Sequence, residues 1–250
     1  MATSTSILVL HNVSKKKNFG ELIRTAAAMG VSEIVVVGAN KLVSHGCHGT
    51  AGYVRFSHFV KFPDAVKYLK EVKGATFCGV EITPDSQAVQ QKPFRGTTAF
   101  LMGNEGQGLT PQQMAECDQF VYIPQHSDAT ASLNVNAACA VVLHHFAMWA
   151  ALPEAPRDGF KYVQGPTPQS TPHSGMGLKQ MRTLNADGTE ASRKRGGDEM
   201  EGGDEAAASI DDLGEAVLDI QDGGDASGHA LEGKDAGGGD NDAVGPAANQ

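Results

Sequence analysis

A segment near the N-terminus carries an arginine that could project into a binding site and an asparagine that could cap a helix. Residues 18–26 read Asn-Phe-Gly-Glu-Leu-Ile-Arg-Thr-Ala. On a helix, Arg24 points about 160° away from the apolar stripe of the same segment, so its guanidinium can project into a site. Asn18 stands where an N-cap residue is expected. The plain alternative, a capped helix with a solvated arginine, is favoured when this segment is taken alone.

A glycine-rich loop follows an apolar strand in the middle of the chain. Residues 99–109 read Ala-Phe-Leu-Met-Gly-Asn-Glu-Gly-Gln-Gly-Leu, with three glycines in six residues. Glycines let a backbone approach a ligand closely and expose its N–H and C=O groups. The spacing matches neither the dinucleotide-binding fingerprint nor the P-loop. The loop therefore indicates a ligand site of another kind, with an ordinary turn as the alternative.

A third polar segment lies between a strand and an apolar helix. The strand ends at Ile123-Pro124, and Ser132-Leu133-Asn134 precedes the helix. Ser132 or Asn134 could simply cap that helix. The order of the elements nevertheless puts this segment, like the glycine loop, directly after a strand.

Alternating strands and helices must position these three segments. The pattern predicts an α/β fold with a mainly parallel sheet, whose ligands bind beyond the carboxyl ends of the strands. The last helix is apolar almost all round, so we expect it to be buried. Strands are predicted over residues 6–10, 33–37, 57–62, 76–80, 98–102 and 119–123, and helices over 19–29, 63–72, from Thr110 onward and over 134–149.

Taken together and in order, the three segments resemble the motifs of the SpoU/TrmH branch of the SPOUT RNA methyltransferases. The resemblance covers roughly Ser6 to Trp149. It implies an α/β domain with a deep trefoil knot at its C-terminal end and a homodimer. It also implies S-adenosyl-L-methionine as cofactor and methylation of a ribose 2′-hydroxyl in RNA.

The same resemblance assigns roles to individual positions. Arg24 matches the catalytic arginine, and further motif polar residues are Asn18, Glu105, Ser132 and Asn134. The segments expected to hold the cofactor contain Val80, Met102, Gly103, Ile123 and Leu133. The loop between Ile123 and Ser132 is one residue longer than the usual family pattern and lacks its methionine and glycine.

Two roles remain open for the motif arginine. It could remove the proton of the ribose hydroxyl, or it could hold an RNA phosphate and stabilise the developing alkoxide. The basic run Lys15-Lys16-Lys17 beside it could contact phosphates or be a surface turn. Transfer RNA is preferred over ribosomal RNA as substrate, because the compact domain has the length of minimal transfer-RNA methyltransferases. A catalytically inert RNA-binding module and a Rossmann-type nucleotide-binding enzyme are the rival interpretations.

The formal net charge of −9 averages two unlike parts of the chain. Residues 1–152 contain 12 basic and 10 acidic residues, a net of +2, and residues 153–250 contain 8 and 19, a net of −11. We therefore expect a methyltransferase domain over 1–152 and a disordered acidic, Gly/Asp-rich tail over 153–250. Apolar residues at helical spacing between Ile210 and Ile220 make a protein partner for the tail conceivable.

Targeting and metal signals are weak. The short polar N-terminus and four cysteines without a C-x-x-C pair point to a cytoplasmic protein with reduced thiols. The basic cluster Arg193-Lys194-Arg195 leaves a nuclear location open. No apolar stretch approaches the roughly 20 residues of a membrane span. His45-Gly-Cys47-His48 lacks the second ligand pair of a structural zinc site, so no metal is expected.

Overall fold

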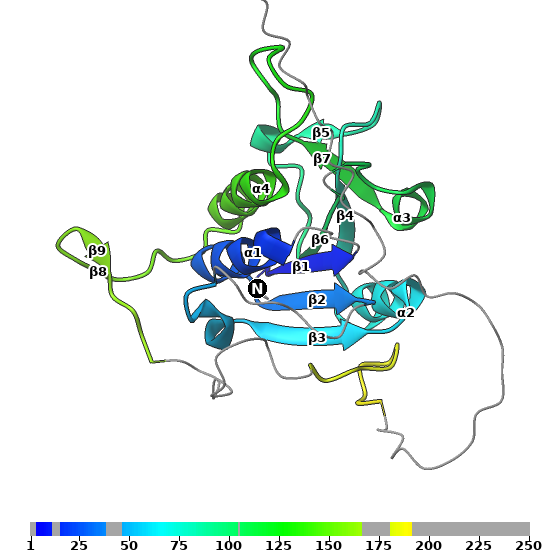
Figure 1. Ribbon diagram of the computed structural model, residues 1–250, viewed down its shortest axis with the longest axis horizontal. Coiled ribbons are helices and arrows are strands. Elements are labelled where there is room, and N and C mark those ends of the chain that lie inside the picture. The colour runs from blue at the N-terminus through cyan, green and yellow to red at the C-terminus, as the bar shows by residue number, and fades with distance from the viewer. Residues whose placement is uncertain (1–3, 12–15, 39–46, 105, 167–180, 192–250) are drawn as a thin grey trace, which may run out of the picture. The chain divides into compact units, whose positions relative to one another are not determined.

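The chain forms a seven-stranded parallel sheet in the computed structural model, which describes residues 4–11, 16–38, 47–104, 106–166 and 181–191 (Figure 1). The strand order is β3-β2-β1-β6-β4-β7-β5, and every pair in the sheet is parallel. The expected α/β fold with a mainly parallel sheet is thereby confirmed. The strands are β1 (Ser6–His11), β2 (Glu33–Val37), β3 (Arg55–Phe59), β4 (Thr76–Val80), β5 (Gln87–Ala88), β6 (Thr98–Met102) and β7 (Gln119–Tyr122).

Helices cover both faces of this sheet. They are α1 (Lys16–Ala28), α2 (Phe62–Lys67) with a π-helical continuation η2 (Tyr68–Val72), α3 (Pro111–Glu116) and α4 (Val135–Trp149). Two short 3₁₀ turns are η1 (Thr50–Tyr53) and η3 (Val89–Gln91). The start predicted at Thr110 is correct: its hydroxyl accepts from the N–H of Gln113, whose side chain accepts from the N–H of Thr110.

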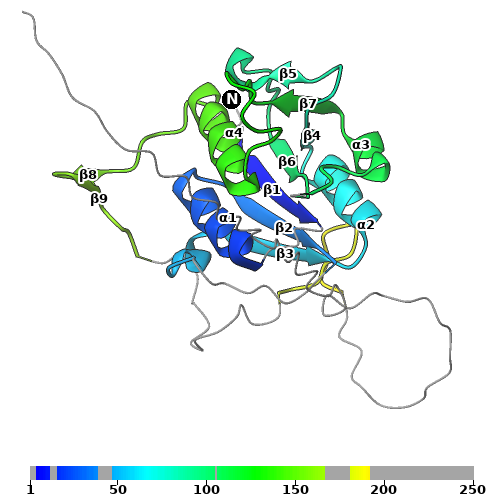
Figure 2. The same ribbon diagram turned by 45° about the horizontal axis from the view of Figure 1, so that its top comes forward.

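The alternation of side chains along β1 divides the apolar core between the two faces. Leu8 and Leu10 belong to a cluster that also includes the buried residues of α1 and α4. Ile7 and Val9 belong to a second cluster with those of α2. Figure 2 shows the corresponding layers, with α1 and α4 side by side on one face and α2 on the other. The central strands are buried on both faces, which is why they read as continuous apolar runs.

The last helix departs from the expectation that it is buried all round. Val135, Cys139, Val142, Leu143 and Phe146 face the core. The opposite side of α4 is exposed in the single chain, where Met148 is 61% accessible. An apolar composition therefore predicted the helix correctly but not the exposure of one of its faces.

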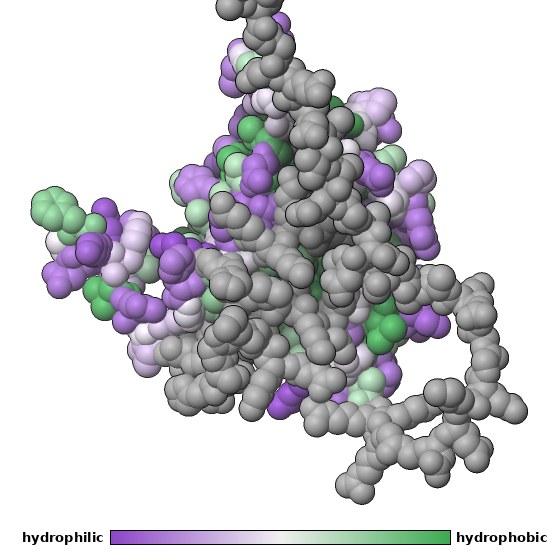
Figure 3. Space-filling model, in the orientation of Figure 1, coloured by the Kyte–Doolittle hydropathy of each residue, from purple (hydrophilic) through white to green (hydrophobic). Residues whose placement is uncertain are grey.

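Two segments beyond residue 152 also form structure, in contrast to the tail expected from composition. A hairpin pairs β8 (Arg157–Asp158) with β9 (Lys161–Tyr162), and its turn residue Phe160 is fully exposed. Figure 3 shows hydrophobic side chains at the surface over this hairpin. Farther along, residues 181–191 pair with the edge strand β3. The compact unit of the chain accordingly runs from Met1 to Arg195.

The pairing at the β3 edge uses both main-chain groups of His58. Its N–H donates to the carbonyl of Arg182 (3.1 Å), and its carbonyl accepts from the N–H of Leu184 (2.8 Å). Met181 is 8% exposed and belongs to the cluster that contains Leu8 and Leu10, and Leu184 is 9% exposed and belongs to the cluster that contains Ile7 and Val9. The basic cluster at residues 193–195 and the apolar pattern at 210–220 lie outside the described residues. Among the described helices, none has the length and apolar character that crossing a membrane requires.

Candidate functional site

A cavity of about 550 Å³ lies at the carboxyl ends of β4, β6 and β7. The sequence places it there because β4 pairs with β6, Val80 opposite Met102, and with β7, Val80 opposite Val121. The loops that leave these strands therefore converge on one edge of the sheet. All five residues expected to hold a cofactor line this cavity: Val80, Met102, Gly103, Ile123 and Leu133.

The glycine loop forms one wall of the cavity and closes on itself. The N–H of Asn104 donates to the carbonyl of Gly108 (3.0 Å), and the N–H of Gly108 donates back to the carbonyl of Asn104 (2.9 Å). The side-chain oxygen of Asn104 accepts from the N–H of Gly106 (2.9 Å). Gly108 adopts a φ of +68°, which favours glycine. Glu105, an expected site residue in the same loop, lies outside the described residues.

Close backbone approach explains the glycine at position 103. A Cβ atom at Gly103 would lie 3.0 Å from backbone atoms of Gly108 on the other arm of the loop. The loop can therefore expose its main chain to a ligand while remaining tightly folded.

Glu81, which the sequence interpretation missed, also lines the cavity. One carboxylate oxygen accepts from the N–H of Leu109 at the end of the glycine loop (2.9 Å). The other accepts from the N–H of Ile82 (3.0 Å). Glu81 belongs to none of the three motifs. The sequence feature that could have indicated it is its position directly after the strand β4.

The third segment supplies three cavity residues, Ile123, Ser132 and Leu133, and one helix cap. Ser132 lines the cavity beside Leu133. Asn134 is the N-cap of α4, and its side-chain oxygen accepts from the N–H of Asn136 (2.9 Å). The capping role left open for Asn134 is therefore present, and its side chain is not part of the cavity lining.

The first segment lies on α1, which begins earlier than expected. Because α1 starts at Lys16, Asn18 lies inside the first turn and is 5% exposed, so the expected N-cap position is wrong. The side chains of Lys16 and Lys17 and all of Lys15 fall outside the described residues. Arg24 is exposed opposite the buried Leu22 and Ala26, as its helical position predicts. It does not line the cavity of the single chain.

A polar contact joins the arginine helix to the helix of the third segment. The hydroxyl of Thr25 donates to the side-chain oxygen of Asn136 (2.8 Å), and the amide of Asn136 donates to Glu21 (3.4 Å). Thr25 and Glu21 flank Arg24 in sequence. This contact fixes α1 against α4 and thus sets the place of Arg24 relative to the cavity side of α4.

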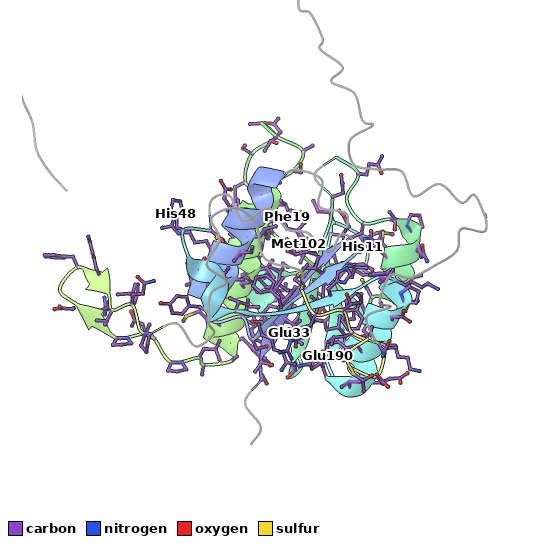
Figure 4. All side chains as sticks on the ribbon, turned by 60° about the horizontal axis from the view of Figure 1, so that its bottom comes forward. His11, Phe19, Glu33, His48, Met102 and Glu190 are labelled. Carbon is purple, nitrogen blue, oxygen red and sulfur yellow. The ribbon has the colours of Figure 1, made fainter. Side chains whose placement is uncertain are left out.

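His11 lies at the carboxyl end of β1, the same end of the sheet as Met102 on the neighbouring strand, whereas Glu33 lies at the start of β2 (Figure 4). Its ring stacks on Phe62 with centroids 4.7 Å apart. Its Nδ1 accepts a hydrogen bond from the amide of Gln113 (3.0 Å), as the two donors of that amide require. Burial lowers the pKa of His11 below its ordinary value of 6.5.

The cysteines offer no reactive thiolate in this region. Burial raises the pKa of Cys78, Cys117 and Cys139 to about 12. Within the described ranges, no group of three or more His, Cys, Asp or Glu side chains is arranged to hold a metal ion. The described lining of the cavity therefore presents backbone groups, apolar side chains, a few hydroxyls and amides, and the carboxylate of Glu81.

The sequence matches the model of the SpoU rRNA Methylase family over residues 5–144. A similar relative is the 23S rRNA (guanosine-2′-O-)-methyltransferase RlmB of Acinetobacter baylyi, 32% identical over 143 residues that cover 55% of this chain and 57% of that protein. The RlmB of Shewanella oneidensis is 32% identical over 142 residues, 55% of this chain and 56% of its own. This chain thus spans a little over half the length of these curated relatives.

Solved structures show the same fold. The AdoMet-bound rRNA methyltransferase of Sinorhizobium meliloti superposes with a TM-score of 0.53 at 22% identity, covering 61% of this chain and 59% of that one. The SpoU methyltransferase AviRb of Streptomyces viridochromogenes, in complex with AdoMet, gives a TM-score of 0.53 at 20% identity, covering 60% and 62%.

Proposed function

This chain belongs to the SpoU rRNA methylase family, and on that premise we propose that it transfers a methyl group from S-adenosylmethionine to a ribose 2′-hydroxyl of RNA. One observation carries the proposal most directly: the five residues assigned to the cofactor from sequence all line the same cavity. They come from three separate segments at the ends of β4, β6 and β7, so their convergence follows from the fold rather than from proximity along the chain.

The cavity fits a nucleoside-bearing cofactor. Its volume of about 550 Å³ falls in the range of about 300–1,000 Å³ typical of small-molecule sites. Apolar Val80, Met102, Ile123 and Leu133 suit the faces of an adenine ring, and the backbone around Gly103 suits its polar edge. When bound, the cofactor supplies a methyl group on a positively charged sulfur.

The protein's own contribution is to place the ribose hydroxyl and to manage its charge. Because guanidinium groups stay protonated in proteins, an arginine is a poor proton acceptor. We therefore assign Arg24 to holding an RNA phosphate and stabilising the developing alkoxide. Correct placement of the two reacting groups accounts for much of the rate in such displacements.

The proposal includes a homodimer, because Arg24 does not line the cavity of its own chain. The exposed side of α4, which carries Ala137, His144 and Met148, is a surface that a second copy could cover. Such a dimer would let Arg24 of one protomer serve the cavity of its partner. The methyltransferase domain over residues 1–152 and the trefoil knot at its C-terminal end are part of the same proposal, which the resemblance of the fold to SpoU structures supports.

Ribosomal RNA is the proposed substrate. The RlmB relatives are named 23S rRNA methyltransferases, which supports ribosomal RNA rather than the transfer RNA expected from the length of the domain. The test is methyl incorporation from labelled S-adenosylmethionine into purified 23S rRNA and into transfer RNA, followed by mapping of 2′-O-methyl positions. Methylation of ribosomal RNA is expected. Methylation of transfer RNA alone would overturn the substrate class, and cofactor binding without any methylation would favour the inert module.

A further inference from the structure

The wall of the cavity formed by the glycine loop is tied to the end of β4 through one side chain. The carboxylate of Glu81 accepts from the N–H of Leu109, which closes the loop, and from the N–H of Ile82 in its own turn. The backbone N–H of Glu81 donates to the carbonyl of Val121 on β7 (3.1 Å). Glu81 is therefore fixed at its backbone by one strand and at its carboxylate by the loop.

The residue opposite this carboxylate is Gly108, whose lack of a side chain leaves space for the carboxylate. A Cβ atom at Gly108 would overlap Oε2 of Glu81, because the two atoms would lie closer than such atoms can approach. Gly108 also adopts a left-handed φ of +68°. The glycine at 108 and the glutamate at 81 thus form a matched pair, in which the absent side chain leaves room for the carboxylate to reach Leu109.

We propose that Glu81 is a positioning residue that holds the glycine loop in the shape required for the cofactor, acting through the N–H of Leu109. The identity of the cofactor rests on the proposed function. The loop closes on itself through Asn104 and Gly108, so without Glu81 it would keep its internal turn but lose its register against β4. The cavity wall would then shift as a unit.

Both carboxylate oxygens are needed for this role, which distinguishes it from a simple effect of charge. A glutamine has a single acceptor oxygen, and its amide nitrogen would face one of the two N–H groups that Glu81 now satisfies. Glu81→Gln therefore retains at most one of the two hydrogen bonds. Its effect should lie between those of the wild type and Glu81→Ala.

The first experiment needs no cofactor. Hydrogen exchange at the amide of Leu109 is measured in the full chain for the wild type, Glu81→Ala and the control Glu71→Ala, whose glutamate side chain is 66% exposed on η2. Exchange at Leu109 should be about tenfold faster or more in Glu81→Ala and unchanged in Glu71→Ala. Equal protection in Glu81→Ala would overturn the proposal, whatever the enzyme's activity.

The second experiment measures the cofactor directly by titration with S-adenosylmethionine. Hydrogen bonds to charged groups predict a rise in Kd of about tenfold or more for Glu81→Ala. The kcat at saturating cofactor and the KM for RNA should stay close to the wild-type values. A fall in kcat with unchanged Kd would contradict a positioning role. Failure of the wild type to bind S-adenosylmethionine would instead overturn the proposed function, while the exchange result would still decide the role of Glu81.

A double-mutant cycle on Glu81 and Gly108 measures whether the two residues act together on cofactor binding. Gly108→Ala should weaken cofactor binding more in the wild type than in the Glu81→Ala background, because the clash with the carboxylate exists only in the former. Additive changes in Kd would show that the two positions act independently and would argue against the matched pair.

Discussion

At the residue scale, the side chain to which we assign charge stabilisation is Arg24, which is exposed and stands on the face of α1 opposite its buried residues. Removing it should therefore cost little stability. We expect Arg24→Ala to lower ribose methylation by about a hundredfold or more, in line with the loss of a group that stabilises developing charge. Methyl transfer to RNA is measured together with the unfolding curve and S-adenosylmethionine affinity.

The matched control for this prediction is Arg95→Ala, which removes another exposed arginine, before β6. Arg24→Lys is informative as well, because a lysine keeps the charge but not the planar fork of donors. A methylation rate in Arg24→Ala equal to that of Arg95→Ala would refute the assignment.

His11 provides a prediction about acid stability. Because burial lowers its pKa below 6.5, the unfolded chain binds this proton more readily than the folded one. The stability that His11 contributes is thus complete above about pH 6.5 and is lost as the pH falls through the folded-state pKa. A one-unit shift corresponds to about 1.4 kcal/mol, and a partly exposed ring contributes less than that.

Substituting His11 should reduce this dependence. We expect the free energy of unfolding of His11→Asn to fall less between pH 7 and pH 5 than that of the wild type, as measured by urea titrations across this range. Asparagine keeps an acceptor for the amide of Gln113, which limits other losses. Parallel pH curves for the two proteins would exclude His11 as the source.

Individual residues also show where sequence reasoning succeeded and where it failed. The five residues that the resemblance assigned to a cofactor line one cavity, because the segments that carry them lie at the ends of parallel strands, which meet at one edge of the sheet. Asn18 was misplaced because its capping preference was read without the preceding lysines, and α1 begins three residues before the expected start at residue 19. Glu81 was missed because its partner is a main-chain N–H 28 residues away, and no local pattern records such a contact.

At the scale of elements, the sequence predicted the central strands of the sheet but not the segment that pairs with its edge strand β3. Buried parallel strands read as apolar runs, so β1, β2, β4 and β6 were predicted to within a residue or so. The partner of the edge strand β3 lies more than 120 residues later in the chain. Its segment, residues 181–191, has the polar composition of its surroundings and buries only a few side chains, so composition predicted a tail instead.

This docked segment predicts an unequal effect of two truncations. Chains ending at residue 152 and at residue 191 have the same net charge of +2, from 12 basic and 10 acidic residues and from 16 and 14. Only the longer one keeps Met181 and Leu184, which are buried against the sheet. The shorter chain should be less stable by about 2 kcal/mol or more, as measured by urea unfolding.

A point variant checks that prediction without changing the length of the chain. Leu184→Ser in the full protein should destabilise it, because a polar group then occupies an apolar position. Thr189→Ser, in the exposed turn of the same segment, serves as the control. The segment would contribute nothing to the folded domain if the two truncated chains were equally stable and if Leu184→Ser were as stable as the full wild-type protein.

At the scale of the whole molecule, the net charge of −9 is a poor guide to the partner. Residues 192–250 contain 15 acidic and 4 basic residues, a net of −11, and the rest of the chain carries +2. The proposed RNA substrate would meet the positive part, and the negative part can compete electrostatically with RNA for that surface. The charge therefore bears on the strength of RNA binding rather than on whether RNA binds.

Removing the acidic part while keeping the docked segment isolates this effect. A chain ending at Ala191 should bind RNA several-fold more tightly than the full chain at about 50 mM salt, where charges interact over more than about 10 Å. The difference should shrink as the salt is raised, because screening removes the competition. Filter binding of 23S rRNA fragments at two salt concentrations measures both Kd values. Equal affinities at low salt would mean that residues 192–250 do not compete with RNA, whatever else they bind.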